Sequence, residues 1–106
     1  MSSITLQCHA LGDDTRWQIL TSIGTEPRSA SELADQLPIS RQAIAKHLAV
    51  LEAAGLAIRE RHGRQVRHRA LGSELTTLAQ RLEQIGAGWE DRLGRLTWVA
   101  ESRAED

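Results

Sequence analysis

The chain has 106 residues, a formal net charge of −1 and a single cysteine, a size that suits one domain, residues 1–106, with a single core. One cysteine excludes an intramolecular disulfide, and no stretch approaches the roughly 20 apolar residues of a membrane span. The only aromatic residues are three tryptophans, too few stacking platforms for the usual single-stranded RNA modules. We therefore expect a cytoplasmic protein without a membrane partner.

Residues 4–11 form the first predicted element, because Ile4, Cys8 and Leu11 recur at i, i+4 and i+7, the spacing of one helix face. The apolar face of so short a helix needs a partner to cover it. Cys8 lies on this stripe, where a cysteine usually behaves as a small buried hydrophobe; a redox or metal role is the alternative. No basic residues precede the apolar ones, so the segment is not expected to be a secretion signal.

A second helix is predicted to begin at Asp13 or Asp14, since aspartate is a favourable N-cap. Gly24 is expected at its C′ position, and residues 25–28 are expected to form a turn that contains a proline. The core-facing side chains of this helix should be Ile19, Leu20 and Ile23. This helix would support the segment that follows.

Two short helices joined by a tight corner are predicted over residues 30–54. Ser29 and Glu32 form an S-x-x-E capping box that starts the first helix, and Pro38 ends it because the residue before a proline is disfavoured in the α region. Ser40 is a favourable N-cap for the second helix, and Gly55 is expected at its C′ position. The core-facing side chains should be Leu33, Ala34, Leu37, Ile44, Leu48 and Leu51. Two helices that meet through such a corner, the second with a polar and basic outer face, predict a helix-turn-helix.

Residues 57–71 predict a β-hairpin, with strands over 57–61 and 66–71. Gly63 can take the positive φ that a hairpin tip needs. Alternation places Val66, His68 and Ala70 on one face of the second strand, and Arg67 and Arg69 on the other. We expect His68 to pack beneath the hairpin.

A long final helix is predicted over residues 73–101, where apolar residues recur every three or four positions. Roughly 29 residues would span about 43 Å at 1.5 Å per residue, longer than a domain of this size can cover by itself. Much of the apolar stripe is therefore expected to meet another chain. Gly86, Gly88 and Gly94 each weaken a helix by roughly 1 kcal/mol, so either the helix bends near Gly86 or close helix approach compensates. Residues 103–106 are expected to fray.

The charges are unevenly distributed along the chain. Residues 40–71 hold seven basic and two acidic residues, a balance of +5, so the remaining residues must sum to −6. A basic face on an acidic body is typical of a soluble protein that binds nucleic acid; a mixed solvated surface is the alternative. With so few aromatic residues, double-stranded DNA is the favoured partner.

With this order of elements, four helices, two strands and a helix, the chain resembles the ArsR family of winged-helix bacterial transcription regulators. The residues that carry the resemblance are ALGDDTRWQIL at 10–20, ELADQL at 32–37, KHLAVLEAAGL at 46–56 and the glycine-arginine tip at 63–64. The resemblance implies a mainly α winged helix-turn-helix fold and repression of a nearby operon. It also implies a homodimer built by the first and last helices. That interface would include Ile4, Cys8, Leu11, Leu82, Ile85, Trp89, Leu93 and Leu96.

Three positions depart from the usual family pattern. Asp14 stands where the family has proline, Trp17 where it has a basic residue, and Ala45 where serine is common. Trp17, Trp89 and Trp98 are expected in the core or the dimer interface, with a cavity for an organic effector as the alternative.

The amino-terminal half of the second helix of a helix-turn-helix is the part that reaches base edges. Gln42 can pair with adenine bidentately, Arg41 can read guanine, and the Ala43 methyl can contact a thymine methyl. Arg64 at the hairpin tip suits insertion into a narrow minor groove. The predicted DNA-binding residues are Ser40, Arg41, Gln42, Ala43, Lys46, His47, Arg61, Arg64 and Arg67. The alternatives are an ordinary solvated helix surface, and strand arginines that only protect an exposed edge.

No cofactor and no metal is predicted. The cysteine site of the family would need thiolates within residues 32–37, which have none, and its terminal-helix site would need histidines, but none follows His68. Cys8 and His9 are adjacent on a helix and point about 100° apart, so they would not converge on one ion. No catalytic constellation is recognisable, so the chain is not expected to be an enzyme.

The sequence therefore predicts a homodimeric, sequence-specific DNA-binding repressor. Its operator would be pseudo-palindromic, with half-sites about one helical turn (roughly 34 Å) apart, and no effector can be assigned. One alternative is a redox- or metal-responsive repressor that uses Cys8. An alternative from a different class is a winged helix that serves only as a protein-interaction module.

Overall fold

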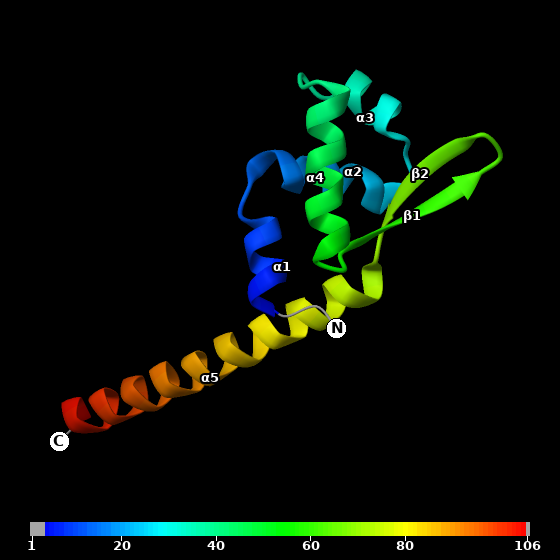
Figure 1. Cartoon of the computed structure of the whole chain (residues 1–106). Coiled ribbons are helices and arrows are strands. Elements are labelled where there is room, and N and C mark those ends of the chain that lie inside the picture. Colours follow the sequence, from blue (N-terminus) through cyan, green and yellow to red (C-terminus); the bar gives the residue numbers. More distant parts are fainter. Residues whose placement is uncertain (1–3, 106) are drawn as a thin grey trace. The chain divides into compact units, whose positions relative to one another are not determined.

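The computed structural model describes residues 4–105 (Figure 1), apart from the side chains at 89–92, 95–97 and 99–105. Its elements, in chain order, are α1 (Ile4–Leu11), α2 (Asp14–Thr25), α3 (Ala30–Gln36), α4 (Arg41–Ala53), β1 (Ala57–His62), β2 (Gln65–Ala70) and α5 (Gly72–Glu105). This is the predicted order of four helices, a hairpin and a final helix. The chain forms two compact units, one that ends at Leu75 and one that begins at Thr76.

The first helix, α1, covers the positions of the predicted apolar stripe but has a different inner face. Gln7 and Ala10 are its buried residues, whereas Cys8 is exposed, so the expectation of a buried cysteine is wrong for the single chain. The small Ala10 side chain suits the side of α1 that packs against α2 and α4. Gln7 is buried because its amide has a partner: its Nε2 donates to Glu74 Oε2 at 3.3 Å.

The second helix, α2, is capped by Asp13, whose carboxylate accepts from the backbone N–H of Arg16 at 3.0 Å. The predicted end at Gly24 is wrong. Among the described glycines only Gly55 and Gly63 have positive φ, and α2 continues to Thr25. The Thr25 hydroxyl satisfies one of the last carbonyls, that of Ser22, at 2.7 Å, so no left-handed glycine is needed there.

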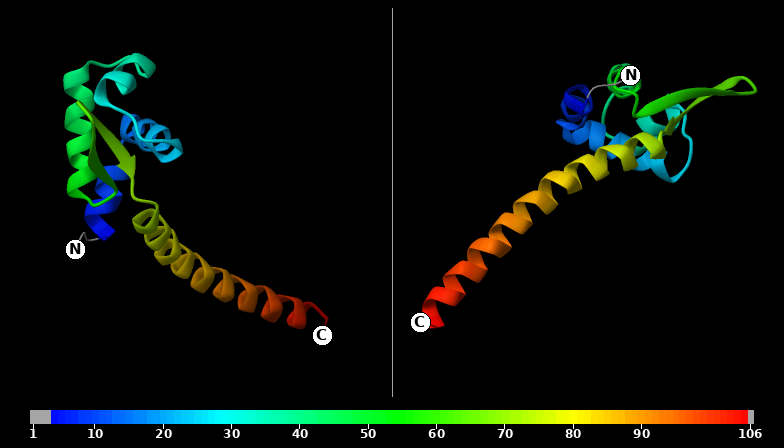
Figure 2. Two further views of the ribbon diagram at one scale, coloured as in Figure 1. Left: turned by 90° about the vertical axis from the view of Figure 1, so that its right-hand side faces the viewer. Right: turned by 90° about the horizontal axis from the view of Figure 1, so that it is seen from below.

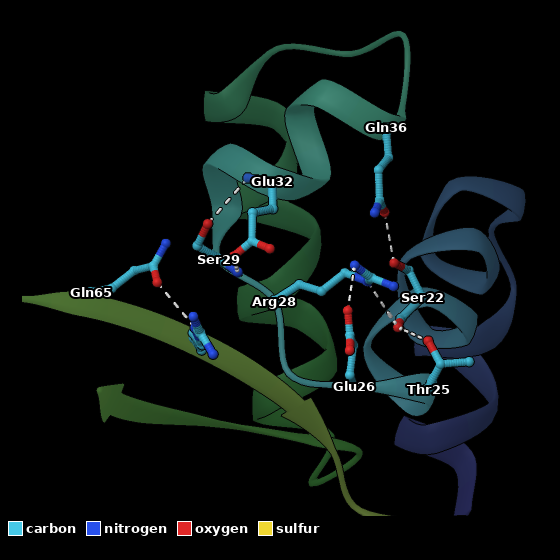
Figure 3. Close-up of polar contacts among 9 residues, drawn as sticks. Ser22, Thr25, Glu26, Arg28, Ser29, Glu32, Gln36 and Gln65 are labelled. Atoms are coloured by element: carbon cyan, nitrogen blue, oxygen red, sulfur yellow. Dashed lines mark hydrogen bonds and ion pairs between the residues drawn. The ribbon is translucent and has the colours of Figure 1, made fainter. Parts of the chain in front are cut away.

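The helix-turn-helix is confirmed, with α3 and α4 joined by residues 37–40. At the start of α3 both bonds of the capping box are present at 3.1 Å: Glu32 N–H donates to Ser29 Oγ, and Ser29 N–H donates to Glu32 Oε1. The first of them is drawn in Figure 3. Ser40 caps α4 by accepting from Ala43 N–H at 3.1 Å. Pro38 lies in the corner, as its effect on the preceding residue requires.

Gly55 ends α4 in a Schellman motif. Its φ is 75°, its N–H donates to Glu52 O, and Leu56 N–H donates to Leu51 O, both at 2.9 Å. Leu51 and Leu56 are both fully buried, which is the hydrophobic contact that accompanies this motif. The chain therefore turns sharply from α4 into β1.

The hairpin is confirmed and its register is fixed. Pairs run from Ala57 with Ala70 to His62 with Gln65, leaving Gly63 and Arg64 as a two-residue loop. Gly63 takes a φ of 66°, as expected for the first central position of a type II′ turn. Leu71 N–H donates to Leu56 O at 2.9 Å and closes the base. Figure 2 shows the hairpin reaching out from the helices α1 to α4.

The core of the first unit lies among α1 to α4 and the base of the hairpin. Its largest fully buried side chains are Ile19, Ile23, Leu33, Ile44, Leu48, Leu51 and Leu56. The inward positions predicted for α2 and α4 are confirmed, since all of them are buried: Ile19, Leu20, Ile23, Ile44, Leu48 and Leu51. The buried stripe of α4 fixes the rotation of that helix and therefore the side chains that it displays.

The last helix, α5, is continuous through Gly86, Gly88 and Gly94. A Cβ built at any of the three would have no described neighbour within 4 Å, so no close approach among the described residues explains them. The helix also extends to Glu105, beyond the expected end at 101, because residues 101–105 include good helix formers. Among the described residues, no helix is both long and apolar enough to cross a membrane.

Candidate nucleic-acid interface

The outer face of α4 carries polar and basic side chains that the core does not use. Arg41, Gln42 and Lys46 are exposed, and Ala43 is partly buried behind the exposed N-cap Ser40. Ile44 and Leu48 hold the opposite face in the core. Within the described part of the chain no carboxylate forms an ion pair with Arg41 or Lys46, so their charges are available to a phosphate.

His47, also on α4, differs from its neighbours because its side chain is only 24% exposed. Its Nδ1 lies 3.3 Å from Nη1 of Arg16 and 4.0 Å from Oδ2 of Asp13. The hydrogen bond from the backbone N–H of Arg16, followed by the charge of the Arg16 guanidinium, holds the pKa of Asp13 below its usual range. Arg16 was not among the predicted site residues. In the sequence, the only feature that singled out Arg16 was its place in residues 10–20, one of the segments that carry the family resemblance.

A groove of about 490 Å³ separates α4 from the hairpin and the start of α3. Three arginines from different segments line it: Arg41 from α4, Arg59 from β1 and Arg64 from the hairpin tip. Glu52 and His68 also line it. Arg59 was not predicted, because the register that brings it to this groove could not be fixed from the charged first strand. Arginines from α4 and from the hairpin therefore bring positive charge to both sides of the groove.

The predicted arginines of the hairpin have different surroundings. Arg61 and Arg64 are exposed, and no ion pair holds either of them in the described structure. Arg67 is partly buried and its Nε donates to Gln65 Oε1 at 3.0 Å (Figure 3). Arg69, on the same strand as Arg67, pairs with Glu60 Oε1 at 2.8 Å. That bond, with a second from His62, lowers the pKa of Glu60.

The base of the hairpin is tied to the helices through His68. It is buried, as predicted, and its Nδ1 lies 2.8 Å from Glu52 Oε1 on α4. Its backbone exchanges two hydrogen bonds with Arg28, at 2.7 and 3.0 Å. The Arg28 side chain in turn pairs with Glu26 at 3.1 Å and donates to Ser22 O at 3.2 Å (Figure 3). The wing and the recognition helix are thus held in one framework.

The residues predicted for a dimer interface fall in two groups. On α1, Ile4 and Leu11 are partly buried and Cys8 is exposed. On α5, Leu82, Ile85 and Leu93 are 52%, 68% and 45% exposed, while the side chains of Trp89 and Leu96 lie outside the described residues. Trp17 and Trp98 are also exposed, so neither belongs to the core of the single chain.

Known proteins resemble this chain in sequence and in fold. Residues 11–61 match a family model described as a helix-turn-helix domain. The HTH-type transcriptional regulator Rv2034 of Mycobacterium tuberculosis is 31% identical over 97 residues, which cover 92% of this chain and 88% of the relative. These named relatives are regulators, in agreement with the prediction that the chain is not an enzyme.

Two solved structures extend the comparison. An ArsR-like transcriptional regulator from Rhodococcus sp. RHA1 is 50% identical, with a TM-score of 0.81 and coverage of 92% of both chains. The homodimeric winged helix-turn-helix DNA-binding domain Mb0332 from Mycobacterium bovis shares the fold, with a TM-score of 0.66 at 20% identity over 79% of this chain and 78% of that one. With its helix-turn-helix, wing and basic groove, this chain belongs to the ArsR family of winged-helix DNA-binding transcriptional regulators.

Proposed function

We propose that the chain acts in the bacterial cytoplasm as a homodimeric repressor that binds a pseudo-palindromic operator. The observation that carries this proposal is the groove between α4 and the hairpin, which Arg41, Arg59 and Arg64 line; no ion pair holds any of the three within the described structure. A DNA backbone is a polyanion, and paired cations on both sides of a groove are suited to its phosphates.

In this proposal α4 enters the major groove. Gln42 reads adenine, Arg41 reads guanine or a nearby phosphate, and the Ala43 methyl contacts a thymine methyl. Lys46 contacts the DNA backbone, and the amino terminus of α4 at its N-cap, Ser40, faces a phosphate. The wing then lies over the adjacent minor groove with Arg64 at its tip, and Arg61 and Arg67 contact phosphates on either side.

The homodimer in this proposal is formed by α5 and α1. The exposed apolar side chains of α5, at 82, 85 and 93, recur at helical spacing, and such a face is covered when a second copy packs against it. The M. bovis domain that shares the fold is described as homodimeric, which supports this arrangement.

Footprinting and titration on the DNA upstream of the gene test the proposal. We expect Gln42→Ala to lose about 1–3 kcal/mol of discrimination at one base pair of each half-site. We expect Arg64→Ala to weaken binding to all sequences and to reduce the salt slope by about 0.9 per protomer. Gln18→Ala, at an exposed position of α2, is the matched control. Equal affinity and equal sequence preference in all of these proteins would contradict the proposed interface.

A further inference from the structure

Arg16 occupies an unusual position, because one guanidinium contacts two helices. Its Nε donates to the carbonyl of Ala10 and its Nη2 to the carbonyl of His9 at 3.4 Å. Both carbonyls belong to the last turn of α1, where a helix leaves acceptors without intrahelical partners. These bonds hold the guanidinium in place and direct its remaining nitrogen, Nη1, toward His47 on α4.

The chemistry of this contact specifies the protonation of His47. An arginine side chain is always charged and can only donate hydrogen bonds. The 3.3 Å contact between Arg16 Nη1 and His47 Nδ1 is therefore a hydrogen bond only if Nδ1 accepts. An imidazole that accepts at Nδ1 is neutral and carries its proton on Nε2. Asp13 Oδ2, at 4.0 Å from Nδ1, is beyond hydrogen-bond distance and already accepts from Arg16 N–H.

The other ring nitrogen of His47, Nε2, is not fully buried. Within the described residues, every buried side-chain nitrogen or oxygen has a hydrogen-bond partner, and Nε2 of His47 has none. That atom is therefore accessible to solvent, on the helix that also displays Gln42 and Lys46. Because His47 lies further from the amino terminus of α4 than the base-reading positions, the acceptor within its reach is the DNA backbone.

We propose that Arg16 is a positioning residue for DNA binding: it holds His47 as the neutral tautomer protonated on Nε2, and that N–H donates to a phosphate oxygen. The inference rests on the proposed function, since it requires the outer face of α4 to meet DNA. It assigns Arg16 a role beyond the support of α1.

The tautomer is measured by nitrogen-15 NMR of the imidazole rings, without DNA and above the pH at which histidines protonate. The wild type should show His47 protonated on Nε2, and Arg16→Gln should give a mixture of the two tautomers. Gln18→Ala, an exposed position on the same helix, should leave the spectrum of His47 unchanged. A wild-type His47 protonated on Nδ1 would overturn the proposal.

Measurements of operator affinity test the His47 Nε2–H donor separately from any effect of Arg16 on folding. His47→Ala should weaken binding roughly 3- to 10-fold, as expected for one hydrogen bond, whereas His47→Gln, whose amide can donate near the Nε2 position, should stay within about 2-fold. The loss should be equal on operator and unrelated duplexes; a loss confined to the operator would indicate a base contact and contradict the phosphate assignment. This pair leaves Arg16 in place, so the donor is tested even if Arg16→Gln does not fold.

A double-mutant cycle tests the role of Arg16 itself. Arg16→Gln should weaken DNA binding in the wild-type background but not in the His47→Gln background, because an amide has no tautomer to fix. Equal losses in both backgrounds would show that Arg16 acts only through the fold.

If Gln42→Ala and Lys46→Ala weaken binding but His47→Ala does not, this inference alone fails. If none of the three weakens binding, the proposed interface on α4 fails as well.

Discussion

The carboxylate of Glu32 accepts a hydrogen bond from the backbone N–H of Ser29, while the Ser29 hydroxyl accepts from Glu32 N–H. The bond from the backbone N–H of Ser29 to the carboxylate, followed by the Ser29 side chain, holds the pKa of Glu32 below its ordinary value of 4.5. A carboxyl whose pKa is lower in the folded chain stabilises the fold above its unfolded pKa. That contribution is lost as the pH falls through the folded value.

The capping box therefore predicts an acid-sensitive share of stability. At pH 7 the wild type should be more stable than Glu32→Gln, which keeps the acceptor for Ser29 N–H but has no charge. The difference should shrink as the pH falls below 4.5 and vanish well below it. Urea unfolding at pH 7 and pH 3 measures it, with Asp35→Asn, an exposed carboxyl of α3, as the control. A difference that is independent of pH would show that the charge of Glu32 contributes nothing.

At the scale of elements, glycines with opposite roles stand in α2 and in the hairpin. Gly24 lies inside α2 and Gly63 takes a φ of 66° at the hairpin loop. A Cβ at either position would meet no atom within 4 Å, so sterics with neighbours do not distinguish them. Only the backbone conformation does.

The same substitution should therefore have opposite effects at the two sites. Gly24→Ala should stabilise the fold by about 1 kcal/mol, the difference in helix propensity, and leave DNA affinity unchanged. Gly63→Ala should destabilise it by about 1–2 kcal/mol, the strain of a left-handed backbone, and weaken DNA binding by displacing Arg64. Thermal unfolding of the two variants against the wild type tests this pair. A Gly63→Ala protein as stable as the wild type would mean that the loop adopts another turn.

At the scale of the whole molecule, α5 exposes apolar residues that a single chain leaves in water. Leu82 and Ile85 are 52% and 68% exposed, and a Cβ added at Gly86, Gly88 or Gly94 would meet no described atom within 4 Å. Both features agree with a second copy packed closely against this helix. The proposed dimer would therefore cover a face that the single chain leaves exposed.

Charge placed on this face should separate the protomers. Leu82→Glu combined with Ile85→Glu should reduce the mass in sedimentation equilibrium from about twice 11.7 kDa to 11.7 kDa. The operator affinity should fall as well, because two linked half-sites become independent. Gln84→Glu, exposed on the same helix, adds charge without removing an apolar contact and should remain dimeric. A double variant that keeps its dimer mass would place the interface elsewhere.

Local signals were enough to predict the order of the elements. Capping residues, Pro38 and Gly55 act within a few positions, and they set the helix-turn-helix as expected. The wrong predictions concern features that are set by tertiary packing or by a competing local hydrogen bond: the buried face of a helix and the residue at which a helix ends. Cys8 lies outside because α1 turns Gln7 and Ala10 inward, and α2 passes Gly24 because the Thr25 hydroxyl satisfies a carbonyl. No sequence rule could pair Arg16 with His47, since 31 positions separate them.

The backbone bridge between Arg28 and His68 has a consequence for the speed of DNA binding. An isolated two-stranded hairpin is only marginally stable in water, but these two hydrogen bonds attach β2 to the segment before α3. The base of the wing is thereby ordered before DNA arrives, and little conformational entropy is lost on docking. The rate of association is then governed by electrostatic encounter with the duplex and falls as the ionic strength rises.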